Sequence, residues 1–444
     1  MLLKTFTLGG VHPEENKISS GQPIRKAPIP KTAVVPITQH IGAPAEIIIA
    51  KGDKVKTGQL IARGQSFISA NVHAPVSGTV TKIDEFMDST GYRRRAIQIE
   101  TEGDEWMETI DRDEKIDATI KRSREEIIQL IKESGIVGMG GATFPTHVKM
   151  MVPQGKKADC LIINGVECEP YLTSDHRLMV ERGEELMIGA RILMTALGVE
   201  KAYIGIENNK PDAIDHLTHL SKRFPGITIH PLKVKYPQGG EKQLIKAIIN
   251  REVPSGKLPI ETGCVVHNVG TAIAVYEAVQ KNKPLFERVV TVTGKSVGNP
   301  CNLLVRIGTP VSVLLEEAGG IPTDTRKVIN GGPMMGKTLN SMDVPVIKGM
   351  SGIVVMAEKE ARRPKISNCI RCARCTFVCP MGLSPYLIAQ MAEARLEGRA
   401  EAERVMDCIE CGSCSFTCPS GRPLLDNIRV AKSKVGQIIR SRAK

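Results

Sequence analysis

The sequence predicts a multidomain chain of α/β and α+β modules that ends in a small, purely helical module. Three observations predict this division: short alternating apolar segments near the N-terminus, a βα rhythm in the middle, and two cysteine runs near the C-terminus. The chain has 444 residues, a length that suits about three domains. We expect an arm and four modules, with the bounds 1–30, 31–103, 120–282, 285–360 and 362–444.

The first 30 residues are rich in Gly and Pro and predict an extended arm. From 33 to about 100, apolar runs alternate with turn signals such as Lys51-Gly52-Asp53, a pattern typical of short β-strands. The segments "AKGDKVKTGQLIA" and "VHAPVSGTV" resemble the lipoyl and biotinyl barrel-sandwich hybrid. Lipoyl domains carry a modified lysine where this chain reads "GQSFISANVHAP", which has no lysine. We therefore expect a structural module here.

A glycine-rich segment follows the charged boundary at 104–122. A helical pattern in Glu125–Glu133 runs directly into Gly138-Met139-Gly140-Gly141. Such glycines let a backbone approach a phosphate, and a helix that begins after them favours anions. A dinucleotide fingerprint would have a strand before the glycines and a third glycine where this chain has Thr143. A tight helix–loop–helix turn therefore remains an alternative.

The middle of the chain alternates strands with helices, which predicts a mainly parallel sheet. The strand Asp159–Ile163 ends in Asn164, and Glu167 and Glu169 follow. Ligands gather at the carboxyl ends of such strands, so these residues are candidates for binding hydroxyls or ring nitrogens, with a solvated loop as the alternative. The next elements are expected at 182–197 (helix), 201–206 (strand), 211–223 (helix), 228–235 (strand) and 240–250 (helix).

Residues 285–357 return to strands around one helix at Pro310–Glu317, which predicts a small α+β module. Within it, Gly331–Gly336 is expected to be a turn that needs unusual φ and has no chemistry of its own.

Two cysteine runs share the spacing Cys-x2-Cys-x2-Cys-x3-Cys-Pro. This spacing is typical of [4Fe–4S] ligands, and in two-cluster proteins the fourth cysteine ligates the other cluster. Zinc sites usually pair two CxxC hooks, so zinc and disulfides are the weaker alternatives. The first cluster is assigned Cys369, Cys372, Cys375 and Cys418, and the second Cys408, Cys411, Cys414 and Cys379. Helices are expected at Pro385–Leu396, Glu401–Met406 and 423–441.

Composition narrows the functional classes. Eight of the 12 cysteines lie in the two runs, and the other four lack pairing signatures, which favours a reducing, cytosolic compartment. The net charge is +12 but aromatics are only 3%, so base-stacking platforms and nucleic-acid partners are not expected. No apolar run approaches the roughly 18 residues of a membrane span, and the N-terminus lacks a signal-peptide pattern.

The C-terminal tail is basic. One interpretation is that this tail contacts anionic headgroups, or membrane subunits on the cytoplasmic side. The alternative is a solvated helix that packs on the preceding module. Its cations are Arg429, Lys432, Lys434, Arg440, Arg442 and Lys444.

Several motifs carry a family resemblance. "GMGGATFPTHVKM" and "CLIINGVECEPYLTSDHR" resemble the flavin-binding NADH subunit of respiratory complex I, and "YPQGGEKQLI" and "HNVGTAIAV" resemble two further pieces of its flavin site. With the N-terminal "FTLGGVHPEENK", the sandwich module and the tandem cysteines, the whole chain resembles the RnfC family of Rnf electron-transport complexes. Cobalamin reductases place the sandwich module after the flavin domain. The component of the sodium-pumping quinone reductase that shares the hybrid module lacks the cluster cysteines.

The resemblance implies a complex I-like flavin domain with non-covalent FMN, NAD(H) as substrate, an SLBB-type β-grasp module at 285–360 and an α-helical ferredoxin domain with two [4Fe–4S] clusters. It implies that Phe144 and Glu169 face the nicotinamide nucleotide as catalytic residues. Lys242 and His267 depart from the family pattern. The resemblance also assigns the FMN phosphate to Gly138, Gly140, Gly141 and Lys149, and the flavin to Asn164, Glu167, Glu241, Asn268 and Thr271.

The implied activity is electron transfer between NAD(H) and the other subunits of a membrane-bound ferredoxin:NAD+ oxidoreductase that moves Na+ or H+ elsewhere in the complex. The implied partner subunits are membrane subunits and ferredoxin-like electron-transfer subunits. The chain would lie peripherally on the cytoplasmic face of the membrane. Two alternatives remain: a soluble reductase similar to the cobalamin reductases, and a non-enzymatic two-cluster relay whose flavin site is vestigial.

Overall fold

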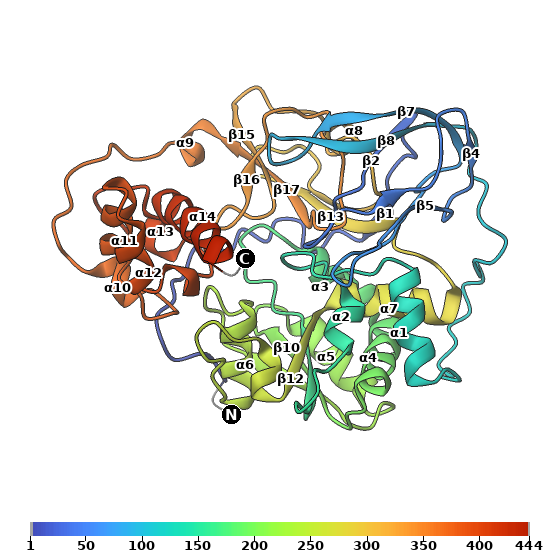
Figure 1. The fold of residues 1–444 in the computed structure, drawn as a ribbon, viewed down its shortest axis with the longest axis horizontal. Coiled ribbons are helices and arrows are strands. Elements are labelled where there is room, and N and C mark those ends of the chain that lie inside the picture. The colour runs from blue at the N-terminus through green and yellow to red at the C-terminus, as the bar shows by residue number, and fades with distance from the viewer. Residues whose placement is uncertain (1–2, 443–444) are drawn as a thin grey trace.

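The computed structural model describes residues 3–442 of the chain. Four sheets and a helical C-terminal module organise these residues. Figure 1 shows the helical module at one end of the molecule, beside the α/β module, while the strands of the N-terminal module lie at the opposite end.

Two small antiparallel sheets form the N-terminal module. Their core contains Val35, Ile61, Val80, Ile97 and Ile99, all fully or almost fully buried. The alternation read in the sequence arises because successive side chains of a strand point to opposite faces. One sheet has the order β2 (Thr32–Pro36), β8 (Arg93–Thr101), β7 (Gly78–Met87) and β4 (Lys54–Val55), and the other β3 (Glu46–Ile47), β5 (Leu60–Arg63) and β6 (Val72–His73).

The α/β module is built on a fully parallel sheet. Its strand order is β11 (Ile227–Leu232), β10 (Ala202–Glu207), β9 (Cys160–Asn164) and β12 (Cys264–Asn268). The chain steps from β9 outward to β11 and then returns to place β12 on the other side of β9, so strand order reverses between β9 and β12. Ligands bind at such a switch point in open α/β sheets.

Seven helices accompany this sheet in the described chain. α7 is apolar on almost all sides and buried, so its sequence has no apolar stripe with a helical period. It was therefore not predicted from the sequence. The helix α3 and the strand β12 were not predicted either. The helices are α1 (Arg124–Glu133), α2 (Thr146–Met150), α3 (Ser174–Glu181), α4 (Gly183–Leu197), α5 (Pro211–Ser221), α6 (Glu241–Ile249) and α7 (Val269–Lys281).

The third module is a mixed six-stranded sheet with α8 (Val311–Glu317). The N-terminal arm supplies its edge strand, because β1 (Ile24–Lys26) pairs in parallel with β14. The arm also runs along the α/β module, where Lys17 Nζ donates to the carbonyls of Glu167, Glu169 and Leu172 at 2.7–2.9 Å. The strand order is β1, β14 (Cys301–Arg306), β13 (Glu287–Thr293), β17 (Gly352–Ala357), β15 (Thr325–Asn330) and β16 (Lys337–Thr338).

The C-terminal module consists of short helices and one long one. The helix expected at Glu401–Met406 is wrong: α12 ends at Ala402 and a 3-10 turn occupies Val405–Asp407. Among residues 3–442, no helix has the length and apolar character needed to cross a membrane. The helix α9 (Glu358–Ala361) still packs on β15 and β17 of the third module. The helices of the C-terminal module are α10 (Arg374–Phe377), α11 (Pro385–Glu393), α12 (Glu397–Ala402), α13 (Ser413–Phe416) and α14 (Leu424–Arg442).

The tail helix α14 packs on its own module. It buries Leu424, Ile428 and Val435, and its cations pair with the module's acids. Lys434 lies 3.4 Å from Glu397. Arg429 and Lys432 both bind Glu410, and Arg442 binds Glu401. The packed helix considered from the sequence is therefore the one observed, while Lys444 lies outside the described residues.

A buried lysine joins three modules. Lys348, 1% exposed, donates its Nζ at 2.8 Å to the carbonyls of Asn71 in the first module and Gly135 before the glycine loop. Its backbone N–H binds Gln39 Oε1. Burial lowers the pKa of Lys348 to about 7, because desolvation disfavours the ammonium form.

Candidate functional site

Two asparagines lie side by side at the carboxyl edge of the parallel sheet. Asn164 ends β9, Asn268 ends β12, and the two are register partners. Asn164 Nδ2 donates to Gly239 O at 2.8 Å, which fixes the loop before α6. Asn268 Oδ1 accepts from Gly270 N at 2.8 Å and caps α7, as an N-cap asparagine does. This edge therefore gathers loops from three parts of the chain.

The glycine loop faces the same edge. Met139 N donates to Thr271 Oγ1 at 2.9 Å, so the first turn of α7 holds the loop. A Cβ on Gly140 would lie 2.6 Å from Asn268 Nδ2, whereas one on Gly141 would meet nothing within 4 Å. Gly140 and Gly141 are exposed, which leaves their backbone open to an anion. The loop turns between α1 and α2, which is the alternative considered from the sequence. Its phosphate role stays a prediction.

A buried arginine supports the loop from the third module. Arg288 on β13 is 5% exposed and donates Nη1 to Met139 O at 3.2 Å, with a second bond to Lys348 O. Met139 is thus held at its N–H by Thr271 and at its carbonyl by Arg288. Arg288 could not be predicted from the sequence, because a single cation inside an apolar strand has no motif.

The carboxylate of Glu167 caps α3. Its Oε1 accepts from Asp175 N at 2.8 Å and its Oε2 from His176 N at 3.1 Å. Asp175 in turn accepts from Asn268 Nδ2 at 2.6 Å. Burial, and next the charge of Glu167, raise the pKa of Asp175 to about 7. Asp175 thus belongs to the site, although no role was predicted for it; its place in "CEPYLTSDHR" was the available signal.

Lys149 and Glu241 form the other rim of the site. Lys149 Nζ lies 3.0 Å from Glu241 Oε1 and 3.0 Å from Val266 O on β12. Glu241 opens α6 directly after the Gly239 loop that Asn164 holds. The structure therefore places Lys149 in an ion pair at the sheet edge.

Glu169 is enclosed by the chain. Its carboxylate accepts from the backbone N–H groups of Met334 (3.1 Å) and Met335 (2.9 Å), and the Tyr236 hydroxyl lies 3.4 Å away. Burial raises the pKa of Glu169 to about 7. The turn at Gly331–Gly336, expected to have no chemistry of its own, thus holds this carboxylate, and a Cβ on Gly332 would collide with it. The nucleotide role expected of Glu169 requires its carboxylate to leave these partners.

Phe144 closes the glycine loop through its backbone. Its carbonyl accepts from Gly138 N at 2.9 Å, and its side chain is partly exposed. Unlike Glu169, Phe144 therefore stays on the open side of the loop.

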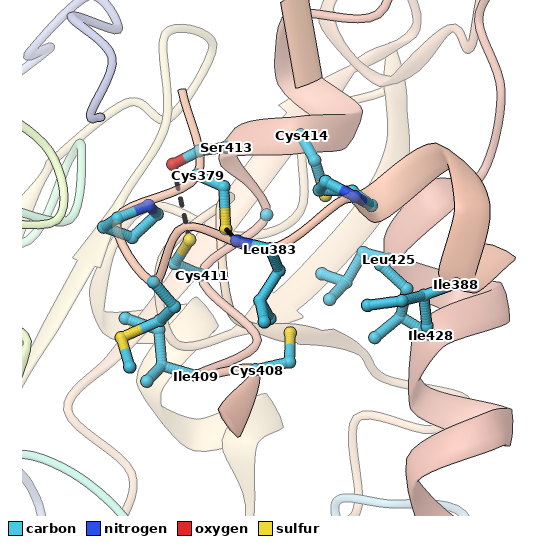
Figure 2. A pocket seen from close by; sticks show the side chains of 14 residues that line it. Cys379, Leu383, Ile388, Cys408, Ile409, Cys411, Ser413, Cys414, Leu425 and Ile428 are labelled. Carbon is cyan, nitrogen blue, oxygen red and sulfur yellow. Dashed lines mark hydrogen bonds between the residues drawn. The ribbon is translucent and has the colours of Figure 1, made fainter. Parts of the chain in front are cut away.

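The second set of cysteines surrounds one apolar cavity. Figure 2 shows Cys379 from the first run beside Cys408, Cys411 and Cys414 from the second, with Ile388, Leu425 and Ile428 nearby. Backbone N–H groups of Leu383 and Glu410 donate to the sulfurs of Cys379 and Cys408, each at 3.4 Å. An apolar cavity with N–H···S donors fits a cubane cluster, and Cys379 joins the run to which the crossed assignment gives it.

The thiols of this cavity are poor acids on their own. Burial raises the pKa of Cys408 to about 11 and of Cys414 to about 12. A metal ion deprotonates the thiols that coordinate it. The thiolate form of this donor set therefore depends on a bound cluster.

The first set of cysteines is only partly assembled. Cys375 is buried, and burial is the main cause that raises its pKa. Cys418 packs against the same apolar core, and the pairing of these two cysteines on one cluster stays a prediction. Cys369 and Cys372 are exposed on a segment without helix or strand between α9 and α10.

Hydrogen bonds connect the cavity of the second cysteine set to the α/β module and the N-terminal arm. Tyr236, on the loop between β11 and α6, donates its hydroxyl to Cys411 O at 2.7 Å. Gln243 Nε2 on α6 reaches Pro380 O at 3.3 Å, and Gly10 N in the arm donates to Val378 O at 2.9 Å. Tyr236 lies within the "YPQGGEKQLI" motif, but no role was predicted for it.

Comparisons with known families agree with this arrangement. Residues 131–277 match the Nuo51 FMN-binding domain and residues 4–104 the RnfC barrel sandwich hybrid domain. Residues 289–338 match the SLBB domain, and residues 364–419 and 337–384 match two models of a 4Fe-4S dicluster domain.

Full-length relatives decide the family. The chain is 45% identical over 406 residues to the C subunit of the proton-translocating ferredoxin:NAD(+) oxidoreductase complex of Clostridium ljungdahlii, covering 90% of this chain and 87% of that protein. It is 43% identical over 429 residues to the Na(+)-translocating counterpart of Acetobacterium woodii, covering 96% of both. The chain belongs to the RnfC family.

Membership in the RnfC family confirms the fold class: a barrel-sandwich hybrid, a complex I-like flavin domain, an SLBB module and a ferredoxin module. It also confirms an oxidoreductase subunit of a larger complex, with FMN and two [4Fe–4S] clusters as cofactors. A solved NAD+-reducing [NiFe]-hydrogenase in the H2-reduced state shares the fold, with 19% identity and a TM-score of 0.52. That match covers 70% of this chain and 63% of that one.

Proposed function

We propose that this chain is the NAD(H)-reactive subunit of its complex, and that it passes electrons between NAD(H), FMN and two clusters to the other subunits. FMN supplies the exchange between a two-electron hydride and single electrons. The bond between Tyr236 and Cys411 carries this proposal, because it sets the cluster module directly against the sheet edge where the flavin residues gather. A complex that moves Na+ or H+ in its other subunits would use this chain as its redox entry.

The glycine loop is proposed to bind the FMN phosphate. Gly140 and Gly141 offer exposed backbone N–H groups, and Gly138 closes the loop beside them through its N–H bond to Phe144 O. The N-terminus of α7 lies against the loop through Thr271. Backbone N–H groups and a helix N-terminus together favour an anion. Arg288 adds a buried cation behind Met139. Lys149 would complete the phosphate site from the rim.

Polar side chains around the loop are proposed to line the flavin. Asn164 and Asn268 present amides at the sheet edge, and Glu167 and Glu241 add carboxylates beside them. Thr271 adds a hydroxyl that already orders the loop. Amides and carboxylates of this kind bind the carbonyls and N–H groups of a flavin ring and the hydroxyls of its ribityl chain.

Phe144 and Glu169 are proposed to contact the nicotinamide nucleotide. Phe144 closes the glycine loop and is partly exposed, and its ring is proposed to stack on the nucleotide. Glu169 reaches the nucleotide only by exchanging its bonds to Met334 and Met335. Nucleotide binding is therefore proposed to be coupled to the turn at Gly331–Gly336, which contacts the ferredoxin module through Met334 and Gly412.

We place the chain peripherally on the cytoplasmic face of the membrane. NAD(H) is a cytoplasmic substrate, and the relatives are named as subunits of translocating complexes. Because most cations of α14 are paired within the module, attachment is proposed to run through other subunits, with headgroups as a minor contribution.

A reductive titration tests the proposal. Anaerobically purified chain should lose its flavin absorbance on addition of NADH, and the EPR signal of a reduced cluster should follow. Glu169→Ala should weaken the NADH dependence while FMN stays bound. A vestigial flavin site, or a relay adaptor, would leave the absorbance unchanged by NADH.

His267 does not favour the adaptor. It is 3% exposed on β12, and burial lowers its pKa well below the ordinary range, so this departure from the family pattern adds no charge beneath the site.

A further inference from the structure

The two cysteine runs are repeats with opposite charge. In the first run the residue after Cys369-Ile370 is Arg371, and in the second run the residue after Cys408-Ile409 is Glu410. Arg371 and Glu410 share the same left-handed backbone, each with φ of 57°. The same loop therefore occurs twice, and the second copy shows how such a loop behaves when it is covered.

The second loop is covered by its own chain. Glu410 lies 3.0 Å from both Arg429 and Lys432 of α14, and Ile409 packs with Val11 and Tyr236. Its charge is neutralised and its apolar residue is enclosed. The second loop is thus an internal interface between the ferredoxin and flavin modules.

The first loop has no such cover within residues 3–442. Ile370 is 68% exposed and Phe377 is 77% exposed, and neither Arg371 nor Arg374 is paired with a carboxylate there. Figure 1 shows the segment between α9 and α10 bowing out along the end of the molecule farthest from the β-rich N-terminal module. An apolar centre with a charged surround is the usual composition of a protein interface.

The charged side chains of this stretch of the chain are all positive. No Asp or Glu occurs between Ala361 and Ala392, a stretch that contains five arginines and lysines: Arg362, Arg363, Lys365, Arg371 and Arg374. Only Arg363 has a partner in the described chain, Asp426 at 2.8 Å. Complementary charge guides encounter and sets orientation between proteins.

We propose that the face formed by Ile370, Arg371, Arg374 and Phe377 is the docking surface for an acidic iron–sulfur protein or domain, which exchanges single electrons with the first cluster. This inference rests on the proposed function and adds the partner's chemistry and the exit side. The second cluster faces the flavin module through Tyr236 and Cys411, and the exposed Cys369 and Cys372 lie on the docking face. An acidic partner with an apolar centre fits where an unpaired basic loop surrounds exposed apolar side chains.

Charge reversal tests the surface. The test variant is Arg371→Glu with Arg374→Glu, and the control is Lys115→Glu with Lys121→Glu, which makes the same change in net charge on the exposed segment before α1. The probe is a small acidic ferredoxin with two [4Fe–4S] clusters, titrated into the oxidised full chain by calorimetry. The test variant should weaken binding at low salt by at least about tenfold, and the control by less than about twofold.

Cofactor counts and two further variants control for loss of the cluster. Because Arg371 and Arg374 lie between ligands, iron and sulfide are counted in every variant. If the reversal loses iron, Arg371→Gln with Arg374→Gln replaces it and should give an intermediate loss of affinity. Phe377→Ser should also weaken binding, with the salt dependence unchanged.

Equal binding by the test variant and the control would overturn the proposal. So would vesicles of phosphatidylglycerol that bind through Arg371 and Arg374 while the ferredoxin does not bind. The calorimetry uses no NADH, so a failure of NADH to bleach the flavin would count against the proposed function and leave this surface untouched.

Discussion

Tyr236 and Cys411 are 175 positions apart in the sequence and meet through a 2.7 Å hydrogen bond from the phenolic hydroxyl to the cysteine carbonyl. The tyrosine belongs to the flavin module and the cysteine to the second cluster. Both are buried, and Val11 of the arm packs on both. This contact supports the proposed order of flavin, second cluster and first cluster.

Tyr236→Phe should shift the second cluster alone. The hydroxyl points the positive end of its dipole toward the chain that bears Cys411, which favours added negative charge on the cluster. Its removal should therefore lower the reduction potential of the second cluster, measured by EPR redox titration. Tyr386→Phe is the matched control, because that side chain is 37% exposed on the first cluster's side. A shift of equal size in both clusters would contradict the contact's role.

Substitutions at neighbouring glycines should separate protein strain from ligand contact. Gly140→Ala places a methyl group 2.6 Å from Asn268 Nδ2, so the loop must move and FMN should be lost. Gly141→Ala meets no protein atom, so the unliganded fold should keep its stability. If FMN lies against this loop, its affinity should still fall. Normal FMN affinity in Gly141→Ala, measured by fluorescence, would remove the phosphate from this position.

The crossed ligand sets predict paired spectroscopic effects. Cys418→Ser should perturb the same EPR signal as Cys372→Ser, because the crossed assignment gives both cysteines to the first cluster. Cys379→Ser should match Cys411→Ser, in keeping with the shared cavity of these two residues. A match between Cys418→Ser and Cys411→Ser would instead assign each run to its own cluster.

The buried Lys348 predicts a pH-dependent stability. Its folded pKa of about 7 lies below the ordinary 10.5, so between these values the unfolded chain binds a proton that the folded chain lacks. The free energy of unfolding of the wild type, relative to Lys348→Met, should therefore rise with pH between about 7 and 10, by at most about 1.4 kcal/mol per pH unit.

Trp106 reports this unfolding. It is the single tryptophan of the chain, and its ring lies 5.1 Å from Phe286, where the first and third modules meet. Urea unfolding followed by its fluorescence gives the free energies. The exposed Lys82→Met is the control, and its difference from wild type should stay constant with pH. A Lys348→Met difference that also stays constant, or falls with rising pH, would show that Lys348 is not held in a desolvated state.

Local sequence patterns predicted most of the fold. Strand alternation, the βα rhythm and cysteine spacing depend on neighbouring residues, so they were readable without a structure. The helix α7 was not predicted, because a helix buried on all sides has no apolar stripe. The edge strand β1 was not predicted either. Its partner β14 is far away in the sequence, and its three residues, two of them Arg and Lys, show no strand pattern.

The candidate site was readable only in part, for the same reason. Gly140 and Asn268 each lie in a motif, yet their contact depends on how β12 returns beside β9. Arg288 and Lys348 are single cations in apolar segments. Their hydrogen bonds to buried carbonyls depend on the packing of the modules, which the sequence does not show. Glu169 shows the opposite case: its motif was visible, but its enclosure by Met334 and Met335 comes from another module.

We propose that one flavin and two clusters form a single electron path within this chain. Cofactor analysis of the anaerobically purified protein, followed by reduction with NADH, tests this path. We expect about eight iron and eight acid-labile sulfide per chain, with one FMN released by acid, and NADH should reduce the flavin and then a cluster. Zinc in place of iron, iron without labile sulfide, or clusters that NADH reduces in flavin-free protein would contradict it.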